Sequence, residues 1–248
     1  MILMIRTIIW FIYFFVHLLA ISPGLLKAKR LKKQGKDEEL DEFVHITARN
    51  WARRLVKLAG GNIIVEGKGN IPENEPVLIV SNHQGNFDIP ILLGWLDMKI
   101  GFISKIEVKK IPLISTWMEY LGCIFIDREN PRNAVKMIIT GAESIKNGQN
   151  LVIFPEGTRS KGGPVAEFKK GSFKLAQKSN AAILPVTIDG SYNMMEANGK
   201  IITPATVKVT IHEPVRIHQN NPTIDGQELA DITRGVIVKN QDVQSKKQ

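Results

Sequence analysis

The stretch VLIVSNHQGNFDIPILLGWL, residues 77–96, shows how this chain is built. Four consecutive apolar residues at its start are typical of a strand that is buried on both faces. A polar segment, NHQGNFD, places His83 and Asp88 directly after this predicted strand. The following residues favour a helix, with Pro90 in its first turn. The stretch is therefore a strand, a loop and a helix in succession, as in the repeating unit of α/β sheets.

The same alternation continues along the chain from residue 62. Short runs rich in apolar and β-branched residues predict strands at 62–68, 77–82, 100–104, 123–127, 150–156, 181–190 and 206–217. Helices are predicted at 89–98, 113–122, 131–148, 169–180 and 226–241. This order predicts an α/β fold with a largely parallel central sheet that is flanked by helices.

The first 21 residues, MILMIRTIIWFIYFFVHLLAI, are apolar, and Arg6 is the only Lys, Arg, Asp or Glu among them. A cleaved signal peptide is one alternative, but LLAISPG is a poor cleavage site and the basic run KAKRLKK follows it. Lys and Arg beside an apolar segment favour the cytoplasmic side. We therefore expect this protein at the cytoplasmic membrane, with the rest of the chain on the cytoplasmic face.

Two placements of this apolar segment are open. A helix of 21 residues, rising about 1.5 Å per residue, could just cross the roughly 30 Å of membrane hydrocarbon. Beyond Arg6, however, only the 15 residues TIIWFIYFFVHLLAI remain, fewer than the roughly 20 of an ordinary span. We therefore favour insertion into one leaflet, as part of a helical hairpin, over a single pass.

A second N-terminal helix is predicted within residues 41–61, where acidic residues precede it and Gly60 and Gly61 end it. Basic residues at steps of four form a row that we call the basic ridge: His45, Arg49, Arg53 and Lys57. One interpretation is a core helix with a solvated basic face. Beside an apolar segment, we favour an interfacial helix whose basic ridge meets anionic lipid headgroups.

These patterns divide the chain into three parts. Residues 1–61 form a membrane-associated two-helix element with a basic linker, residues 62–240 form the α/β domain, and residues 241–248 form a polar tail. The net charge is +9, and residues 1–57 hold 11 of the Lys and Arg but only five of the Asp and Glu. A nucleic-acid enzyme would more often spread its basic residues over a binding face, so a membrane surface is the expected partner rather than nucleic acid. Cys123 is the only cysteine, which excludes an internal disulfide and indicates a reducing compartment.

Polar residues follow four of the predicted strands, where each strand ends. They are His83 and Asp88, then Lys105, then Arg128, and finally Glu156, Gly157 and Arg159. Sites in parallel sheets gather beyond the carboxyl ends of the strands. A histidine there can accept a proton from an alcohol, and a carboxylate on its other ring nitrogen would orient it. Alternatively, Asp88 caps the helix that follows and His83 binds loop backbone.

The cations at these strand ends suit a phosphate group. Arginine binds phosphate through two nitrogens at once, and Lys105 would add a point charge. Each cation alone is more often a solvated surface residue, but together with His83 and Asp88 they indicate a phosphate-bearing substrate near a general base.

A protein nucleophile is missing from the sequence. No Gly-x-Ser-x-Gly motif occurs, and Cys123 lies inside a predicted strand. The attacking group would then be water or a substrate hydroxyl. The scattered histidines do not indicate zinc, although a metal held by His83, Asp88 and Glu156 is a further alternative.

Four segments, NHQGNFD, GCIFIDR, FPEGTRS and ILPVTIDG, resemble in this order the motif blocks of the His-x4-Asp glycerolipid acyltransferases. The likeness covers roughly residues 62–217. FPEGTRS and the N-terminal helices are similar to those of the bacterial 1-acyl-sn-glycerol-3-phosphate acyltransferases, which are lysophosphatidic acid acyltransferases. No departure within the four blocks suggests an inactive member.

The resemblance implies a role for each motif residue. His83 would be the general base and Asp88 its orienting partner. Arg128 and Arg159 would bind the acceptor phosphate, and Glu156 and Gly157 would shape the acceptor site. Lys105 is added to the phosphate site from its strand-end position alone. Pro185, in the fourth block, would shape the acyl site.

The implied reaction moves a fatty acyl group from acyl-CoA or acyl carrier protein to the sn-2 hydroxyl of lysophosphatidic acid, with no metal or redox cofactor. Glycerol 3-phosphate or another lysophospholipid is an alternative acceptor. Two alternatives come from other classes: a membrane-bound phosphoesterase, and a non-catalytic protein that binds anionic lipid.

Overall fold

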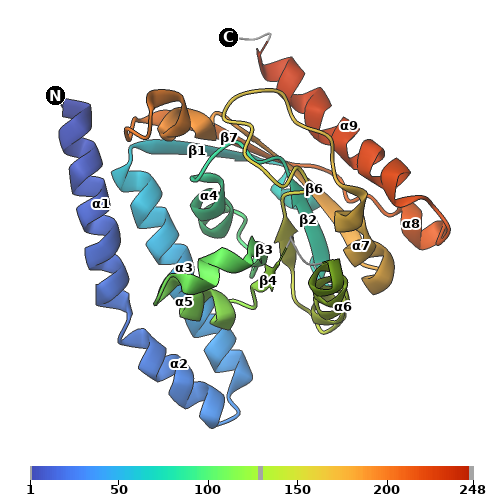
Figure 1. Ribbon diagram of the computed structural model, residues 1–248, viewed down its shortest axis with the longest axis horizontal. Helices are drawn as coiled ribbons and strands as arrows, with labels where there is room; N and C mark the ends of the chain where they lie inside the picture. Colours follow the sequence, from blue (N-terminus) through green and yellow to red (C-terminus); the bar gives the residue numbers. More distant parts are fainter. Residues whose placement is uncertain (1, 128–130, 246–248) are drawn as a thin grey trace.

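A computed structural model describes residues 2–127 and 131–245 of the 248. Within these residues one sheet of seven strands forms the centre of the molecule (Figure 1). Its strands are β1 (Gly61–Glu66), β2 (Val77–Ser81), β3 (Gly101–Lys105), β4 (Ile124–Ile126), β5 (Leu151–Ile153), β6 (Ala182–Asp189) and β7 (Ala205–Ile211). They lie in the order β1-β7-β6-β2-β5-β3-β4. Every strand predicted from the sequence is present.

All neighbouring strands in this sheet are parallel except β6 and β7. Leu78 of β2 lies opposite Leu151 of β5 and Ile183 of β6, and all five residues of β2 are buried. Because β2, β5, β3 and β4 are consecutive and parallel, their carboxyl ends meet at one edge. The predicted α/β fold with a largely parallel sheet is confirmed.

Helices cover both faces of the sheet (Figure 1). One face carries α3 (Asp37–Leu58), α4 (Asp88–Trp95) and α5 (Ile114–Tyr120), and α1 (Ile2–Ile21) and α2 (Gly24–Lys33) lie outside α3. The other face carries α6 (Pro131–Lys146), α7 (Lys174–Ser179) and α9 (Gly226–Ser245). The remaining short helices are η1 (Lys68–Asn70), η2 (Ile106–Lys110), η3 (Lys170–Phe173), η4 (Ser191–Met194), η5 (Glu196–Asn198) and α8 (Ile217–Asn220).

Each face of the sheet has its own hydrophobic core. Alternate residues of β2 separate the two cores, since Val77 and Ile79 belong to the α3–α4 side and Leu78 and Val80 to the α6–α9 side. Three layers, helices on sheet on helices, therefore bury the central strands β2 and β5 and leave their carboxyl ends as the accessible edge.

The N-terminal part contains three helices rather than two. The basic run at residues 27–33, expected as a linker, is α2 instead. Ala28 and Leu31, three residues apart on one side of α2, are buried in the contact with the rest of the protein. This contact stabilises a helix that its basic composition did not suggest. The boundaries predicted for the α/β domain and the polar tail stay predictions.

Only part of the basic ridge of α3 is turned into the protein, since Lys57 is exposed. His45 is only 4% exposed, and its Nδ1 lies 3.0 Å from the carboxylate of Asp41. Arg53 donates from Nε to the Gly94 carbonyl of α4 at 2.6 Å and from Nη2 to Asp97 at 3.0 Å. His45 is therefore not available to headgroups, because α3 packs this side of itself against the protein. The contact of Arg49, Arg53 and Lys57 with headgroups stays a prediction, and α3 packs on the core as the alternative expected, but with a basic face that is only partly solvated.

Candidate active site

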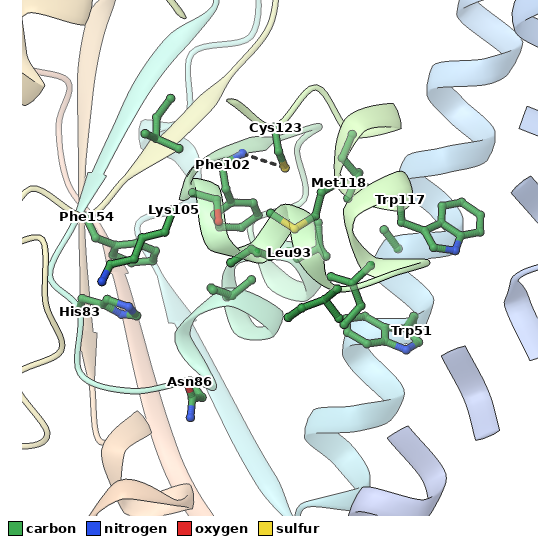
Figure 2. Close-up of a pocket in the computed structure, with 18 of the residues that line it drawn as sticks. Trp51, His83, Asn86, Leu93, Phe102, Lys105, Trp117, Met118, Cys123 and Phe154 are labelled. Atoms are coloured by element: carbon green, nitrogen blue, oxygen red, sulfur yellow. Dashed lines mark hydrogen bonds between the residues drawn. The ribbon is translucent and has the colours of Figure 1, made fainter. Parts of the chain in front are cut away.

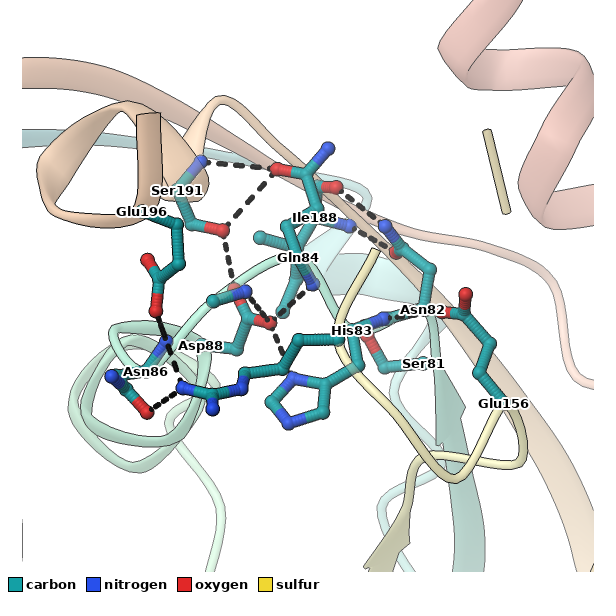
Figure 3. A network of polar contacts seen from close by, with 12 residues as sticks. Ser81, Asn82, His83, Gln84, Asn86, Asp88, Glu156, Ile188, Ser191 and Glu196 are labelled. Atoms are coloured by element: carbon teal, nitrogen blue, oxygen red, sulfur yellow. Dashed lines mark hydrogen bonds and ion pairs between the residues drawn. The ribbon is translucent and has the colours of Figure 1, made fainter. Parts of the chain in front are cut away.

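His83 and Asp88 are joined across the loop between β2 and α4. His83 Nδ1 lies 2.7 Å from Asp88 Oδ2, and the side chains are 16% and 0% exposed (Figure 3). The remaining ring nitrogen, Nε2, is thus left for a substrate. The two groups have the geometry that a histidine base and its orienting carboxylate require. Their catalytic roles stay predictions.

The Asp88 carboxylate collects further donors. Its Oδ2 also accepts the backbone N–H groups of Gln84, at 2.6 Å, and Gly85, at 2.9 Å. Its Oδ1 accepts the hydroxyl of Ser191, which follows β6. Because these N–H donors precede Asp88, its carboxylate is not a cap for the N–H groups of α4, as the alternative proposed. These hydrogen bonds fix the buried carboxylate in a position facing the imidazole.

Glu156 lies behind His83 and fixes its backbone. Oε1 accepts the backbone N–H of His83 at 2.7 Å, and Oε2 accepts that of Ala166 at 2.9 Å. Burial raises the pKa of Glu156, and the two N–H bonds oppose that rise. The ring of Phe154 stacks on the imidazole, with centroids 4.1 Å apart. Glu156 therefore supports the base from behind and does not line the cavity described next.

A cavity of about 630 Å³ opens beside the imidazole. Figure 2 places His83, Phe154 and Lys105 on one side of it and Trp51 and Trp117 on the other. Most of its walls are apolar and come from α1, α3, α4, β3, η2, α5 and the segment that follows β5. They include Phe14, Leu18, Ile21, Leu93, Phe102, Ile111, Ile114, Met118 and Leu121. The imidazole of His83 thus lies at the wall of a large apolar cavity.

Two of the three predicted cations can be placed with respect to this cavity. Lys105 and Arg159 both line it, as do Gly157 and Thr158 of the loop after β5. Gly157 has φ of 72°, a left-handed conformation that glycine adopts without strain. Arg128 lies outside the described residues, so its place in the site stays a prediction. Pro185 is inside β6 and does not line this cavity, and its expected part in shaping an acyl site stays a prediction.

The sequence also raised the questions of a thiol nucleophile at Cys123 and of a metal site. Burial raises the pKa of Cys123 to about 12, so its thiol stays protonated at neutral pH, as expected for a residue inside the predicted strand. Within residues 2–127 and 131–245, no group of three His, Cys, Asp or Glu could hold a metal ion. Both oxygens of Glu156 accept backbone N–H groups, so the alternative set of His83, Asp88 and Glu156 is not arranged for a metal.

Three contributors to the site were missed in the sequence. Ser191 directly follows ILPVTIDG, so the fourth block could have pointed to it. Asn82 precedes His83, and its side-chain amide makes two hydrogen bonds of 2.8 Å with the backbone of Ile188, which ties β2 to β6. Glu196 contacts Arg159 and the loop of His83, and no feature of the sequence marks it.

A family model and several known proteins match this chain in sequence, and all of them are described as acyltransferases. Residues 62–189 match a family model described as acyltransferase. The chain is 32% identical over 182 residues to the 1-acyl-sn-glycerol-3-phosphate acyltransferase of Borreliella burgdorferi, covering 73% of this chain and 72% of that one. It is 36% identical over 176 residues to a chloroplastic 1-acyl-sn-glycerol-3-phosphate acyltransferase of Arabidopsis thaliana, covering 70% of this chain but only 49% of the plant protein.

A solved structure is similar over almost the entire chain. The crystal structure of the 1-acyl-sn-glycerophosphate (LPA) acyltransferase PlsC from Thermotoga maritima matches with a TM-score of 0.84 and 28% identity. The match covers 97% of this chain and 95% of the other. The likeness therefore includes the N-terminal helices, which lie outside the range of the family model.

Proposed function

This chain belongs to the acyltransferase family, and we propose that it transfers a fatty acyl group from acyl-CoA or acyl carrier protein to the sn-2 hydroxyl of lysophosphatidic acid. The product is phosphatidic acid. The observation that carries the proposal is the oriented imidazole of His83 at the wall of an apolar cavity that Arg159 also lines. An acyl chain, a base and a phosphate-binding cation are thereby brought together.

The reaction follows from the free Nε2 of His83. This nitrogen removes the proton from the sn-2 hydroxyl, and the resulting alkoxide attacks the thioester carbon. The tetrahedral intermediate collapses and expels a thiolate, which takes the proton back from the imidazolium. Asp88 stabilises that imidazolium while it exists. The substrate hydroxyl is itself the nucleophile, so the proposal includes no covalent acyl-enzyme, metal or redox cofactor.

The cavity suits the acyl chain of a substrate. Its walls combine aromatic and aliphatic side chains with few polar groups other than those beside His83. Each methylene group transferred from water into such surroundings contributes about 0.8 kcal/mol. Lys105 and Arg159 line the same cavity near the imidazole and would hold the phosphate of the acceptor there.

A transfer assay with labelled acyl-CoA or acyl carrier protein and several acceptors tests the proposal. Lysophosphatidic acid should be acylated faster than glycerol 3-phosphate, other lysophospholipids and monoacylglycerol. Preference for another acceptor would keep the family chemistry and change the substrate. Phosphate release that a chelator abolishes would support the phosphoesterase alternative, and lipid binding without turnover would support the non-catalytic one.

Arg159→Lys is expected to raise the KM for lysophosphatidic acid roughly tenfold and to change the KM for the acyl donor much less. Lysine keeps the charge but loses the planar fork with which arginine binds phosphate. Steady-state kinetics with each substrate varied in turn measure this. Lys169→Ala, which removes an exposed cation that does not line the cavity, is the control and should leave both values unchanged. Equal damage to both KM values would contradict the assignment of Arg159.

We also propose that α1 binds the membrane surface. Residues 2–33 include one helical stretch long and apolar enough to cross a membrane by length and composition. Most large apolar side chains of α1 are exposed, among them Ile5, Ile8, Ile9, Ile12, Phe15, Val16 and Leu19. An exposed apolar face of this size marks a contact surface, and its position beside the cavity would admit lysophosphatidic acid from the lipid.

The contacts of α1 support insertion into one leaflet. Trp10 donates from Nε1 to the Leu55 carbonyl of α3 at 2.9 Å, and Arg6 donates to the Ala59 carbonyl at 3.3 Å. The hydroxyl of Thr7 accepts the backbone N–H of Ile202 at 2.9 Å. If α1 crossed the bilayer as it stands, the end of α3 and the segment at Ile202 would have to enter it too. Labelling of a cysteine at Ile2, in a Cys123→Ser background, by an impermeant reagent outside intact cells would contradict the one-leaflet arrangement.

The double variant Ile12→Glu/Leu19→Glu should weaken binding to anionic vesicles at least roughly a hundredfold, because two aliphatic side chains leave the lipid at about 1.5–3 kcal/mol each. Both side chains point away from the protein, at 58% and 63% exposed, so the fold should be kept. Vesicle co-sedimentation measures the effect. Ile232→Glu, on α9 over the other face of the sheet, is the matched control. Equal binding by all three proteins would show that another surface holds the membrane.

A further inference from the structure

Glu196 lies in η5, beyond the residues that the family model matches, yet it reaches the loop of His83. Its side chain is only 6% exposed. Oε1 accepts the backbone N–H of Asn86 at 2.8 Å and lies 3.4 Å from Nη1 of Arg159 (Figure 3). The side-chain oxygen of Asn86 accepts a hydrogen bond from the same Nη1. Glu196 and Asn86 therefore hold one nitrogen of the guanidinium between them.

The loop of His83 is built to admit this carboxylate. A Cβ at Gly85 would collide with the carboxylate of Glu196. Gly85 does not have a positive φ, so the glycine is needed here for space rather than for backbone conformation. Met195, the preceding residue, adds a contact from its sulfur to the Asn86 amide at 3.3 Å. Met195 and Glu196, two neighbouring residues after β6, thus both contact Asn86.

Only one nitrogen of the Arg159 guanidinium is hydrogen-bonded by residues that the structure describes. Both of its contacts are made by Nη1, and Nε and Nη2 make no hydrogen bond to any residue that the structure describes. Arg159 also lines the cavity together with His83 and Asn86. A guanidinium that is anchored at one nitrogen can still present its other edge, Nε and Nη2, to two oxygens of a phosphate.

We infer that Glu196 is a positioning residue for the acceptor: with Asn86 it orients Arg159 so that the free edge of the guanidinium meets the phosphate of lysophosphatidic acid. The inference rests on the proposed function, since it needs an acceptor with a phosphate. Glu196 acts through Arg159 and touches no reacting atom. Anchoring the long side chain before binding reduces the rotamer freedom that phosphate binding would otherwise remove.

The opposite role makes a different prediction. If Glu196 competed with the phosphate for Arg159, its removal would free the guanidinium and lower the KM for the acceptor. A positioning residue does the reverse, because the guanidinium then has to be ordered by the phosphate itself. The direction of the change in KM therefore separates the two roles.

The test compares Glu196→Ala and Glu196→Gln with the wild-type protein in the acyl-transfer assay. Glu196→Ala should raise the KM for lysophosphatidic acid about tenfold, the effect of one charge-assisted hydrogen bond, and leave kcat and the donor KM within about twofold. Glu196→Gln keeps an oxygen that can accept from Asn86 and Arg159, so its rise in KM should be smaller. Asn198→Ala, which removes a hydrogen bond to the Asn193 carbonyl within the same segment, is the matched control and should behave as wild type.

Glu196→Ala in an Arg159→Ala background shows whether Glu196 changes the KM for lysophosphatidic acid through Arg159. There, Glu196→Ala should add less than about twofold to the KM, because the residue that it positions is gone. A full additional rise in that background would overturn the inference, and so would an unchanged or lowered KM in Glu196→Ala alone. Wild-type protein that fails to acylate lysophosphatidic acid would contradict the proposed function instead, so the two failures are distinguishable.

Discussion

His83→Ala should abolish measurable acyl transfer, with a fall in kcat on the order of 10⁴-fold, the upper end of what general acid–base catalysis contributes. Among the residues that the structure describes, the imidazole is the one group at the cavity wall with the orientation of a base, because its Nδ1 faces Asp88 and its Nε2 is left for the hydroxyl. Without it, the sn-2 hydroxyl would have to attack the thioester as a neutral alcohol or give its proton to water. Labelled acyl transfer at saturating lysophosphatidic acid measures the change.

The control for this variant must separate chemistry from folding. His218 is buried and its Nε2 lies 2.9 Å from the Ala181 carbonyl, but it does not line the cavity. His218→Gln should therefore keep the turnover of wild type per folded molecule, whatever its effect on stability. Thermal unfolding should show that His83→Ala is folded, since its backbone N–H still binds Glu156. Near-normal turnover by folded His83→Ala would refute the base mechanism.

Asp88→Asn should lower kcat by roughly a hundredfold to ten-thousandfold. The structure gives this loss a different reason from the one that the motif suggests. Three N–H groups, from His83, Gln84 and Gly85, converge on Oδ2. They would hold the amide oxygen of an asparagine in that place, so the imidazole keeps its orientation. What the variant loses is the negative charge that stabilises the imidazolium.

Asn is therefore the informative replacement at this position. Its amide nitrogen would face the hydroxyl of Ser191, which can accept as well as donate, so the fold should survive. Alanine would instead leave the N–H groups of Gln84 and Gly85 buried without an acceptor, at about 1–3 kcal/mol each. Asp97→Asn, which neutralises a carboxylate paired with Lys68 and Arg53 away from the cavity, is the matched control for charge. A rate within a few-fold of wild type for Asp88→Asn would show that the charge is not needed.

Much of the fold could be predicted because it rests on local patterns. Every predicted strand is present, since runs such as VLIV and LVIF are short, apolar and bounded by turn residues. The fold class followed from their alternation with helices. The basic run at residues 27–33 shows the limit of prediction from local patterns. Its composition suggested a linker, but it is a helix, because two of its side chains are buried against the rest of the protein.

Part of the candidate site could also be predicted from the sequence, because the order of the strands brings certain residues together. In a parallel sheet, residues that follow neighbouring strands must meet at one edge, so His83, Lys105 and Arg159 could be grouped without coordinates. The pairing of His83 with Asp88 lies within a single loop and could be read from the spacing. Roles that depend on Arg128 stay predictions, because that residue lies outside the described part of the chain.

Other features come from contacts between distant parts of the chain. Ser191 meets Asp88, and Glu196 meets Asn86, across more than 100 residues of sequence. The cavity takes its walls from α1, α3 and α5 as well as from the sheet, and Arg53 of the basic ridge binds α4 through the Gly94 carbonyl. Periodicity reports which side of an element is apolar, but not which other element covers it. The sequence by itself therefore determined the strand positions and the motif residues. The partners of Asp88 and Arg159, and the cavity beside His83, were decided only by the tertiary structure. The reason is that burial and hydrogen bonding join groups that no local pattern relates.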